Sequence, residues 1–203
     1  KLHKDLVVKS SDNRLILGDT GVKLQQKTHQ LFSGTIKFED GSTRVVDPSK
    51  AEFIKEKFQG YKIGIFYKFI AELEMLKQVF KETLTTDLNE FDTTNKNIAL
   101  QIVSGREGIS LRNADHLVFM NIDFSAVSYF QAKDRMTTLE RKENTIFWIF
   151  SKDGIEEKIY KTVQGKKDYT NSTFKKDFNV GATDSNKNNQ QANKRWMALS
   201  KSN

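Results

Sequence analysis

The stretch from Ile98 to Thr162 decides the fold class, and it reads IALQIVSGREGISLRNADHLVFMNIDFSAVSYFQAKDRMTTLERKENTIFWIFSKDGIEEKIYKT. It opens on an apolar run that leads directly into a glycine-containing loop, Ser104 to Gly108. Two more apolar runs, His116 to Met120 and Thr145 to Phe150, are each followed by a segment with helical character. Strand-like runs that alternate with loops and helices predict an α/β domain on a mainly parallel sheet, with helices on both faces.

The residues before this stretch extend the pattern. The run from Lys62 to Tyr67 is short and apolar, which is typical of a buried parallel strand, and a helical pattern follows it. Nearer the start, we expect a helix from about Thr20 and a hairpin between Thr35 and Val46. The sequence therefore predicts a connecting segment with helix and hairpin (1–48), the α/β domain (49–168) and a flexible polar tail (169–203).

Composition narrows the classes of function. The chain has no cysteine, and its three histidines are far apart, so no metal site is predicted. No apolar run approaches the ~18–20 residues that span a bilayer, so we expect no membrane partner and a cytoplasmic, intracellular location. A formal charge of +7 favours polyanionic partners, nucleic acid first, although a merely lysine-rich surface explains it equally well.

Two segments have residues suited to binding phosphate. Gly105 and Gly108 lie where a strand should end, so the backbone there can approach a phosphate, although such loops are often plain turns. Gln131, Asp134 and Arg135 share one face of a predicted helix and could bind phosphate oxygens or form a solvated charge cluster. The chain has no Gly-x-x-x-x-Gly-Lys-Ser/Thr loop and no strand ending in an Asp-Glu pair, so we do not expect it to hydrolyse nucleotides alone.

Taken together, the motifs resemble the second RecA-like domain of superfamily-2 helicases, and most closely that of Swi/Snf-type ATPases. The similarity covers about Gly34 to Val163. The segments that carry it are the motif IV strand Lys62–Phe69 with Glu72, motif V at Ser104–Leu111 with the strand after it, the Asp123–Ser125 turn, the start of motif VI at Gln131–Arg135, and the ending Gly154–Ile159.

The resemblance implies the second lobe of a two-lobed helicase or translocase. ATP and Mg²⁺ would bind mainly through an N-terminal RecA-like lobe of the same protein, which is absent from these 203 residues. Arg135 would act as an arginine finger on the transferring phosphoryl group. Nucleotide-facing positions would be Gly105, Gly108, Gln131 and Asp134. Lys68, Ser104 and Arg106 would contact nucleic acid, with DNA as the expected polymer.

One departure from the family leaves hydrolysis open. The family usually has a second arginine three residues after the first, and here that position is Thr138. Arg141 is the candidate replacement. One alternative is a stand-alone nucleic-acid-binding or interaction module on a degenerate motor fold. Another is an unrelated α/β enzyme for a small phosphorylated ligand, which stands only if Arg135 and the 104–108 loop lie on different edges of the sheet. The chain starts at Lys1, so we expect a piece of a longer protein that is inactive by itself.

Overall fold

A six-stranded sheet forms the centre of the protein in a computed structural model, which describes residues 7–102, 111–135, 145–180 and 196–201. For residues 131–135 and 196–201 only the backbone is described. The strand order is β10-β9-β8-β5-β7-β6, and all neighbours are parallel except β10 and β9. The strands are β5 (Ile63–Tyr67), β6 (Leu84–Thr85), β7 (Asn97–Gln101), β8 (His116–Phe119), β9 (Ile146–Ser151) and β10 (Trp196–Lys201).

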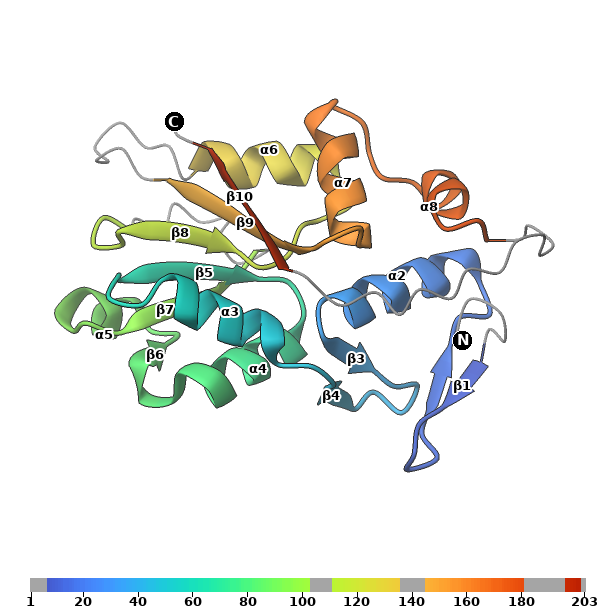
Figure 1. Ribbon diagram of the computed structural model, residues 1–203, viewed down its shortest axis with the longest axis horizontal. Coiled ribbons are helices and arrows are strands. Elements are labelled where there is room, and N and C mark those ends of the chain that lie inside the picture. Colours follow the sequence, from blue (N-terminus) through green and yellow to red (C-terminus); the bar gives the residue numbers. More distant parts are fainter. Residues whose placement is uncertain (1–6, 103–110, 136–144, 181–195, 202–203) are drawn as a thin grey trace.

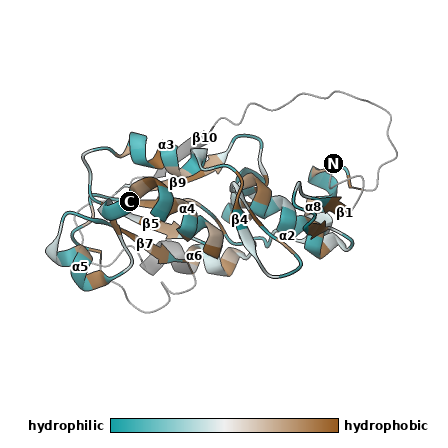
Figure 2. Ribbon diagram, turned by 90° about the horizontal axis from the view of Figure 1, so that it is seen from below, coloured by the Kyte–Doolittle hydropathy of each residue, from teal (hydrophilic) through white to brown (hydrophobic). Residues whose placement is uncertain are grey.

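Helices cover both faces of this sheet (Figure 1). On one face lie α3 (Ser49–Lys57) and α4 (Ile70–Phe80), and on the other lie α6 (Ala126–Arg135) and α7 (Ile155–Gln164). The two faces have separate apolar cores, and the brown strands between teal-edged helices in Figure 2 show this layering. The predicted fold class, a mostly parallel sheet flanked by helices as the RecA-like resemblance implies, is confirmed.

Strand β5 shows why the sheet is buried on both sides. Ile63, Ile65 and Tyr67 point into the core under α3 and α4, whereas Phe66 belongs to the opposite core. Side chains of a strand alternate between faces, so a strand covered twice must be apolar at every position. The burial of β5 on both faces therefore explains why the sequence is apolar throughout Ile63–Tyr67.

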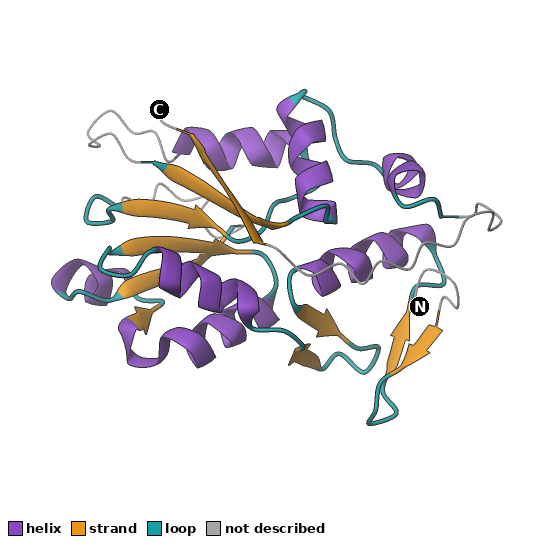
Figure 3. Cartoon of the chain, in the orientation of Figure 1, coloured by secondary structure: helices purple, strands orange, loops and turns teal. Residues whose placement is uncertain are grey.

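The connecting segment, residues 1–48 of the sequence, precedes the sheet. It contains β1 (Val7–Lys9), β2 (Leu15–Leu17), α2 (Gly21–Phe32), β3 (Thr35–Lys37) and β4 (Thr43–Val45). Thr20 caps α2 by accepting a hydrogen bond from the Lys23 N–H at 3.2 Å. Gly34 has φ +85°, and its carbonyl accepts from the N–H groups of Val46 and Asp47, which closes the hairpin base. Helix α2 and the hairpin lie beside the carboxyl ends of β5 and β8 (Figure 3).

Two regions contain more regular structure than the sequence indicated. The polar segment between Phe80 and Asn97 forms a 3₁₀ turn η1 (Lys81–Thr83), β6 and the short helix α5 (Leu88–Thr93). Residues 169–203, expected as a flexible tail, contain α8 (Asn171–Asp177) and the edge strand β10. Phe174 of α8 is fully buried, and β10 adds backbone hydrogen bonds to the edge of β9, so each element is held by contacts distant in sequence.

Candidate functional site

The centre of the sheet has a topological switch point between β5 and β8. The two strands are parallel neighbours, but the connections that follow them lead to opposite sides of the sheet. The chain passes from β5 through α4 toward β6, and from β8 through α6 toward β9. In open α/β sheets, ligands bind at the carboxyl ends of strands at such a point. The residues that directly follow β5 and β8 are therefore the first candidates for a site.

Lys68 and Asp123 meet at this position. The Lys68 Nζ lies 2.8 Å from Asp123 Oδ1, and the two side chains are 19% and 31% exposed. The same ammonium is 5.0 Å from the centroid of the Phe124 ring. A partly exposed lysine that is held by one carboxylate and one ring keeps access to solvent, so a phosphate group can compete for it.

The backbone of Lys68 is fixed from several sides. The N–H groups of Lys68 and Phe69 both donate to Glu72 Oε2 at 2.8 Å, and Gln101 Nε2 donates to the Lys68 carbonyl at 3.2 Å. Glu72 is fully buried, and its other oxygen accepts from Asn121 Nδ2 at 2.6 Å. Burial raises the pKa of Glu72, while the charge of Lys50 and these hydrogen bonds lower it. The start of α4 is therefore preorganised by a buried carboxylate.

A second buried ion pair lies behind this edge. Lys50 Nζ of α3 is 2.5 Å from Glu156 Oε1 of α7, and both side chains are inaccessible to solvent. Glu156 Oε2 accepts from the N–H of Ser151, the last residue of β9. Burial raises the pKa of Glu156 to about 6, and Lys50 opposes this shift. Because α3 and α7 cover opposite faces, the pair joins the two layers at the carboxyl end of the sheet.

His29 of α2 is the least satisfied polar group at this edge. It is fully buried, neither ring nitrogen makes a hydrogen bond with the described residues, and its ring packs against Phe69 and Phe124. Burial and the charges of Lys68 and Lys50 hold the pKa of His29 well below its usual value, with Asn121 acting in the opposite direction. His29 is therefore neutral and links the connecting segment to the loops after β5 and β8.

The other predicted site residues lie in or next to undescribed segments. Ser104, Gly105, Arg106, Gly108 and Arg141 fall outside the described residues. The chain enters the first of these segments close to Lys68, because the Ile102 N–H donates to the Tyr67 carbonyl at 2.8 Å. Lys68 and Ile102, the last described residue before that segment, thus share one edge of the sheet.

Gln131, Asp134 and Arg135 lie on α6, as predicted, although only their backbone is described. Helix α6 connects the carboxyl end of β8 to the amino end of β9, so it runs back along the sheet. Its ten residues rise about 15 Å, which places Arg135 away from Lys68 and toward the opposite edge. Arg135 is therefore separated from Lys68 along the length of the sheet.

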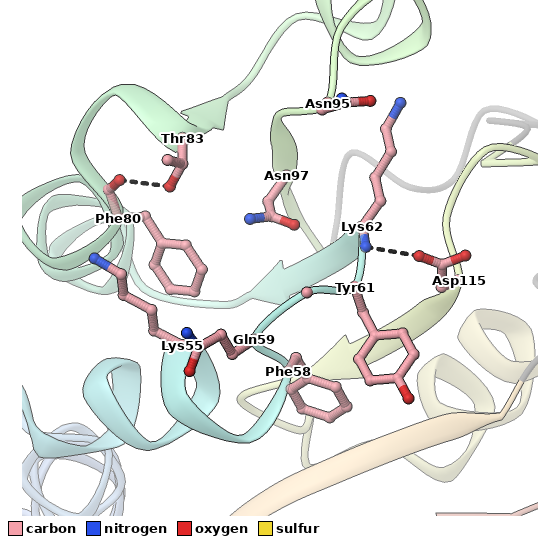
Figure 4. Close-up of a pocket in the computed structure, with 11 residues that line it drawn as sticks. Lys55, Phe58, Gln59, Tyr61, Lys62, Phe80, Thr83, Asn95, Asn97 and Asp115 are labelled. Atoms are coloured by element: carbon pink, nitrogen blue, oxygen red, sulfur yellow. Dashed lines mark hydrogen bonds between the residues drawn. The ribbon is translucent and has the colours of Figure 1, made fainter.

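Two cavities mark the two edges of the sheet. One, of about 410 Å³, lies between α2, the β3–β4 hairpin and the start of α4, and Lys68 is part of its wall. The other, of about 530 Å³, lies at the amino edge, where Lys55, Phe80, Asn97 and Asp115 surround it (Figure 4). Only the first cavity adjoins the switch point.

Comparison with known proteins gives a distant likeness in fold. No protein-family model matches the chain, and no curated protein matches it. Among solved structures, the chain is similar to the crystal structure of the C-terminal part of the Fun30 ATPase domain, with 22% sequence identity and a TM-score of 0.42. The likeness covers 55% of this chain and 44% of that chain, so it spans less than half of the Fun30 fragment.

The described residues contain neither a metal cluster nor a membrane span. No group of three or more histidine, cysteine or acidic residues in the described ranges could hold a metal ion. Within the same part of the chain, no helix has the length and apolar character needed to cross a bilayer.

Sequence reasoning found Lys68 but missed its surroundings. Asp123 was visible only as part of an acidic-aromatic turn, and nothing in its position indicated that it faces a lysine 55 residues away. The Lys50–Glu156 pair spans 106 residues and has no local signature. For His29, the one available signal is its place among the apolar residues of an amphipathic helix.

Proposed function

We propose that this chain is the second motor lobe of an ATP-dependent nucleic-acid helicase or translocase. In this role it supplies motifs IV, V and VI to an ATP site shared with a first lobe that carries the phosphate loop and the magnesium ligands. Nucleic acid, with DNA as the expected polymer, lies along the carboxyl edge of the sheet.

The observation that supports this proposal is the arrangement of the motif-bearing segments around β5. The motif IV strand is central, the motif V segment follows its neighbour β7, and the motif VI helix α6 follows its other neighbour β8. Segments that are distant in sequence thus form or follow three adjacent strands of the sheet. A chance match of isolated motifs would not require them to occupy adjacent strands.

The chemistry assigned to the chain is mainly electrostatic. Lys68 offers a cation to the phosphate backbone without reading bases, as movement along a strand requires. Arg135 supplies positive charge to the transferring phosphoryl group. Gln131 and Asp134 lie on the same helix and face the nucleotide. When bound, ATP would supply the phosphoryl group and Mg²⁺ would neutralise part of its negative charge. The separation between Lys68 and the end of α6 suits a lobe that binds two ligands at once.

The test is an Arg135→Ala substitution in the complete protein that carries this lobe. We expect nucleic-acid-dependent ATP hydrolysis to fall by about 10³-fold or more, with little change in nucleic-acid binding, because the arginine acts on the phosphoryl group. A Lys77→Ala variant on the exposed end of α4 serves as the control. Near-normal turnover in Arg135→Ala would remove the arginine-finger assignment. Turnover by the 203-residue chain alone would overturn the shared-site proposal.

A specific departure favours a second candidate function. Thr138 stands where the family has its second arginine, and the net charge of +7 fits a polyanion-binding module without hydrolysis. Under this alternative, the complete protein binds nucleic acid with the same affinity with or without ATP, and no first lobe is required. Measuring ATP turnover in the presence and absence of DNA separates the two functions.

A further inference from the structure

The cavity beside Lys68 has walls from both the connecting segment and the α/β domain. Its lining residues are Gln26, Gln30, Thr35, Ile36, Lys37, Gly41, Thr43, Lys68, Phe69, Ile70 and Ala71. This set includes two lysines and no carboxylate. The amino-edge cavity differs, because Asp115 is part of its lining. The composition of the first cavity therefore suits an anion.

Gln30 places an unpaired donor in this cavity. Its side chain belongs to a residue that is only 5% exposed, and its Oε1 accepts a hydrogen bond from the Lys37 N–H at 3.0 Å. That bond fixes the amide orientation and leaves the Nε2 group without a partner among the described residues. Among the described residues, the side-chain atoms that are both buried and unpaired belong to His29 and His116, so the Gln30 Nε2 is open to the cavity. A donor kept in this position is suited to an acceptor that arrives from outside.

The first turn of α4 adds two more donors. The N–H groups of Lys68 and Phe69 are occupied by Glu72, but those of Ile70 and Ala71 have no partner in the described part of the chain. Helix α4 has 11 residues, and the amino end of such a helix carries a partial positive charge. Backbone donors and a helix dipole together favour a phosphate oxygen.

Lys37 supplies a full charge at the mouth of the cavity. It is exposed, and no carboxylate of the described residues pairs with it, whereas the neighbouring Lys27 pairs with Glu39 at 3.1 Å. Lys68, on the other side, is already paired with Asp123. The acidic groups around the cavity have other partners: Glu74 of α4 accepts from Thr43, Glu39 pairs with Lys27, and Asp40 accepts from Ser42. Lys37 is thus the cation with the most freedom to bind a ligand there.

We propose that this cavity is an oxyanion site for one phosphate group, bound by Gln30 Nε2, the N–H groups of Ile70 and Ala71, and Lys37. The inference rests on the proposed function for the source of that phosphate, a polynucleotide backbone passing the carboxyl edge. Gln30 and Lys37 come from the connecting segment, outside every motif of the resemblance. That segment is therefore part of the nucleic-acid-binding surface and not only a link to the domain.

The test compares two variants with a matched control in the full 203-residue chain. Lys37→Gln removes the free charge, and Gln30→Glu keeps the acceptor for the Lys37 N–H while replacing the amide donor with a carboxylate. Lys77→Gln makes the same charge change on an exposed lysine of α4 outside the cavity. Binding of labelled single-stranded DNA is measured by fluorescence anisotropy across a range of salt concentrations. Amide shifts of Ile70 and Ala71 are followed by NMR during titration with inorganic phosphate.

For Lys37→Gln we expect affinity to fall about 5-fold near 0.1 M salt and the salt slope to fall by about 0.7, the loss of one contact on a single strand. Gln30→Glu should lose more affinity for DNA than Lys37→Gln does. Lys77→Gln should bind DNA with the same affinity and salt slope as the unmodified chain. If Gln30→Glu does not fold, Lys37→Gln alone decides. Equal behaviour of Lys37→Gln and Lys77→Gln would overturn the site, while DNA binding that still depends on Lys68 would leave the proposed function standing. Shifts of Ile70 and Ala71 with phosphate in a chain that does not bind DNA would support the oxyanion site and reject the proposed function.

Discussion

The two edges of the sheet use lysine in different ways. At the amino edge, Lys62 Nζ donates to the carbonyls of Phe91 and Thr94, and Lys55 Nζ donates to the carbonyl of Val79, so both cations cap the ends of helices. At the carboxyl edge, Lys68 pairs with a partly exposed carboxylate, and no carboxylate of the described residues pairs with Lys37. A lysine held by backbone carbonyls is a structural element. One that is held by an exchangeable partner remains available for a ligand.

The largest expected effect concerns the buried pair behind the carboxyl edge. Lys50→Met leaves Glu156 buried without its partner, and breaking such a pair destabilises a protein by about 3–5 kcal/mol. Urea unfolding at pH 7 measures this change. The control is Lys161→Met, which removes an exposed partner of Glu157 on α7 and should change the free energy of unfolding much less. Equal losses in the two variants would show that the Lys50–Glu156 pair does not hold the two layers together.

A direct comparison of the edges comes from Lys62→Met and Lys68→Met. Lys62→Met removes hydrogen bonds from a charged group to two carbonyls, and we expect a loss of about 1.5–3 kcal/mol in the free energy of unfolding. Its DNA affinity should change only by the general charge effect. Lys68→Met should lose little stability and weaken DNA binding by about 5-fold near 0.1 M salt. If Lys62→Met weakens DNA binding and Lys68→Met lowers the free energy of unfolding instead, then the carboxyl edge is not the DNA-binding edge.

The next effect depends on pH. His29 stays neutral in the folded state because its pKa is lowered, whereas the unfolded chain takes up a proton below about pH 6.5. The folded state therefore loses stability relative to the unfolded state as the pH falls below 6.5, by at most about 1.4 kcal/mol per pH unit. The His29→Leu variant should not show this loss.

A single pH profile would not reveal the contribution of His29. Glu156 has a pKa of about 6, above its ordinary value, so its protonation favours the folded state as the pH falls through 6. The two contributions have opposite signs in the same range. The measurement is therefore the difference in unfolding free energy between wild type and His29→Leu. This difference should be constant above pH 7.5 and change steadily below pH 6.5, and a constant difference down to pH 5 would contradict the assignment of a lowered pKa.

The extent to which the sequence predicts the structure depends on distance along the chain. The strand Ile63–Tyr67, the cap of α2 by Thr20 and the hairpin after Gly34 follow from neighbouring residues, so local patterns predict them. The strand β6 has two residues, and β10 exists through its pairing with β9, so neither has a pattern of its own. Periodicity cannot reveal elements that depend on distant partners.

The candidate site divides in the same way. Lys68 was predicted because it follows a recognisable strand, and Gln131 and Arg135 because they share a helix face. Asp123, which pairs with Lys68, and Asn121, which holds Glu72, come from another segment that the sheet topology brings to Lys68. Gln30 and Lys37 lie in a segment without any motif. The identity of a residue can indicate that it could bind phosphate. Its contacts with other residues decide whether its charge is available for that binding.

The smallest expected effect concerns the partner of Lys68. Asp123→Asn removes the carboxylate that competes with phosphate for the ammonium, while the amide oxygen can still accept from the Phe124 N–H as Oδ1 does at 2.7 Å. We expect DNA to bind up to about 5-fold more tightly near 0.1 M salt, with a salt slope that rises toward one added contact. Asp115→Asn, which alters a carboxylate at the amino edge, is the matched control and should have no effect beyond its charge. If both substitutions raise affinity equally, then only net charge matters and the exchangeable partner of Lys68 has no role in binding.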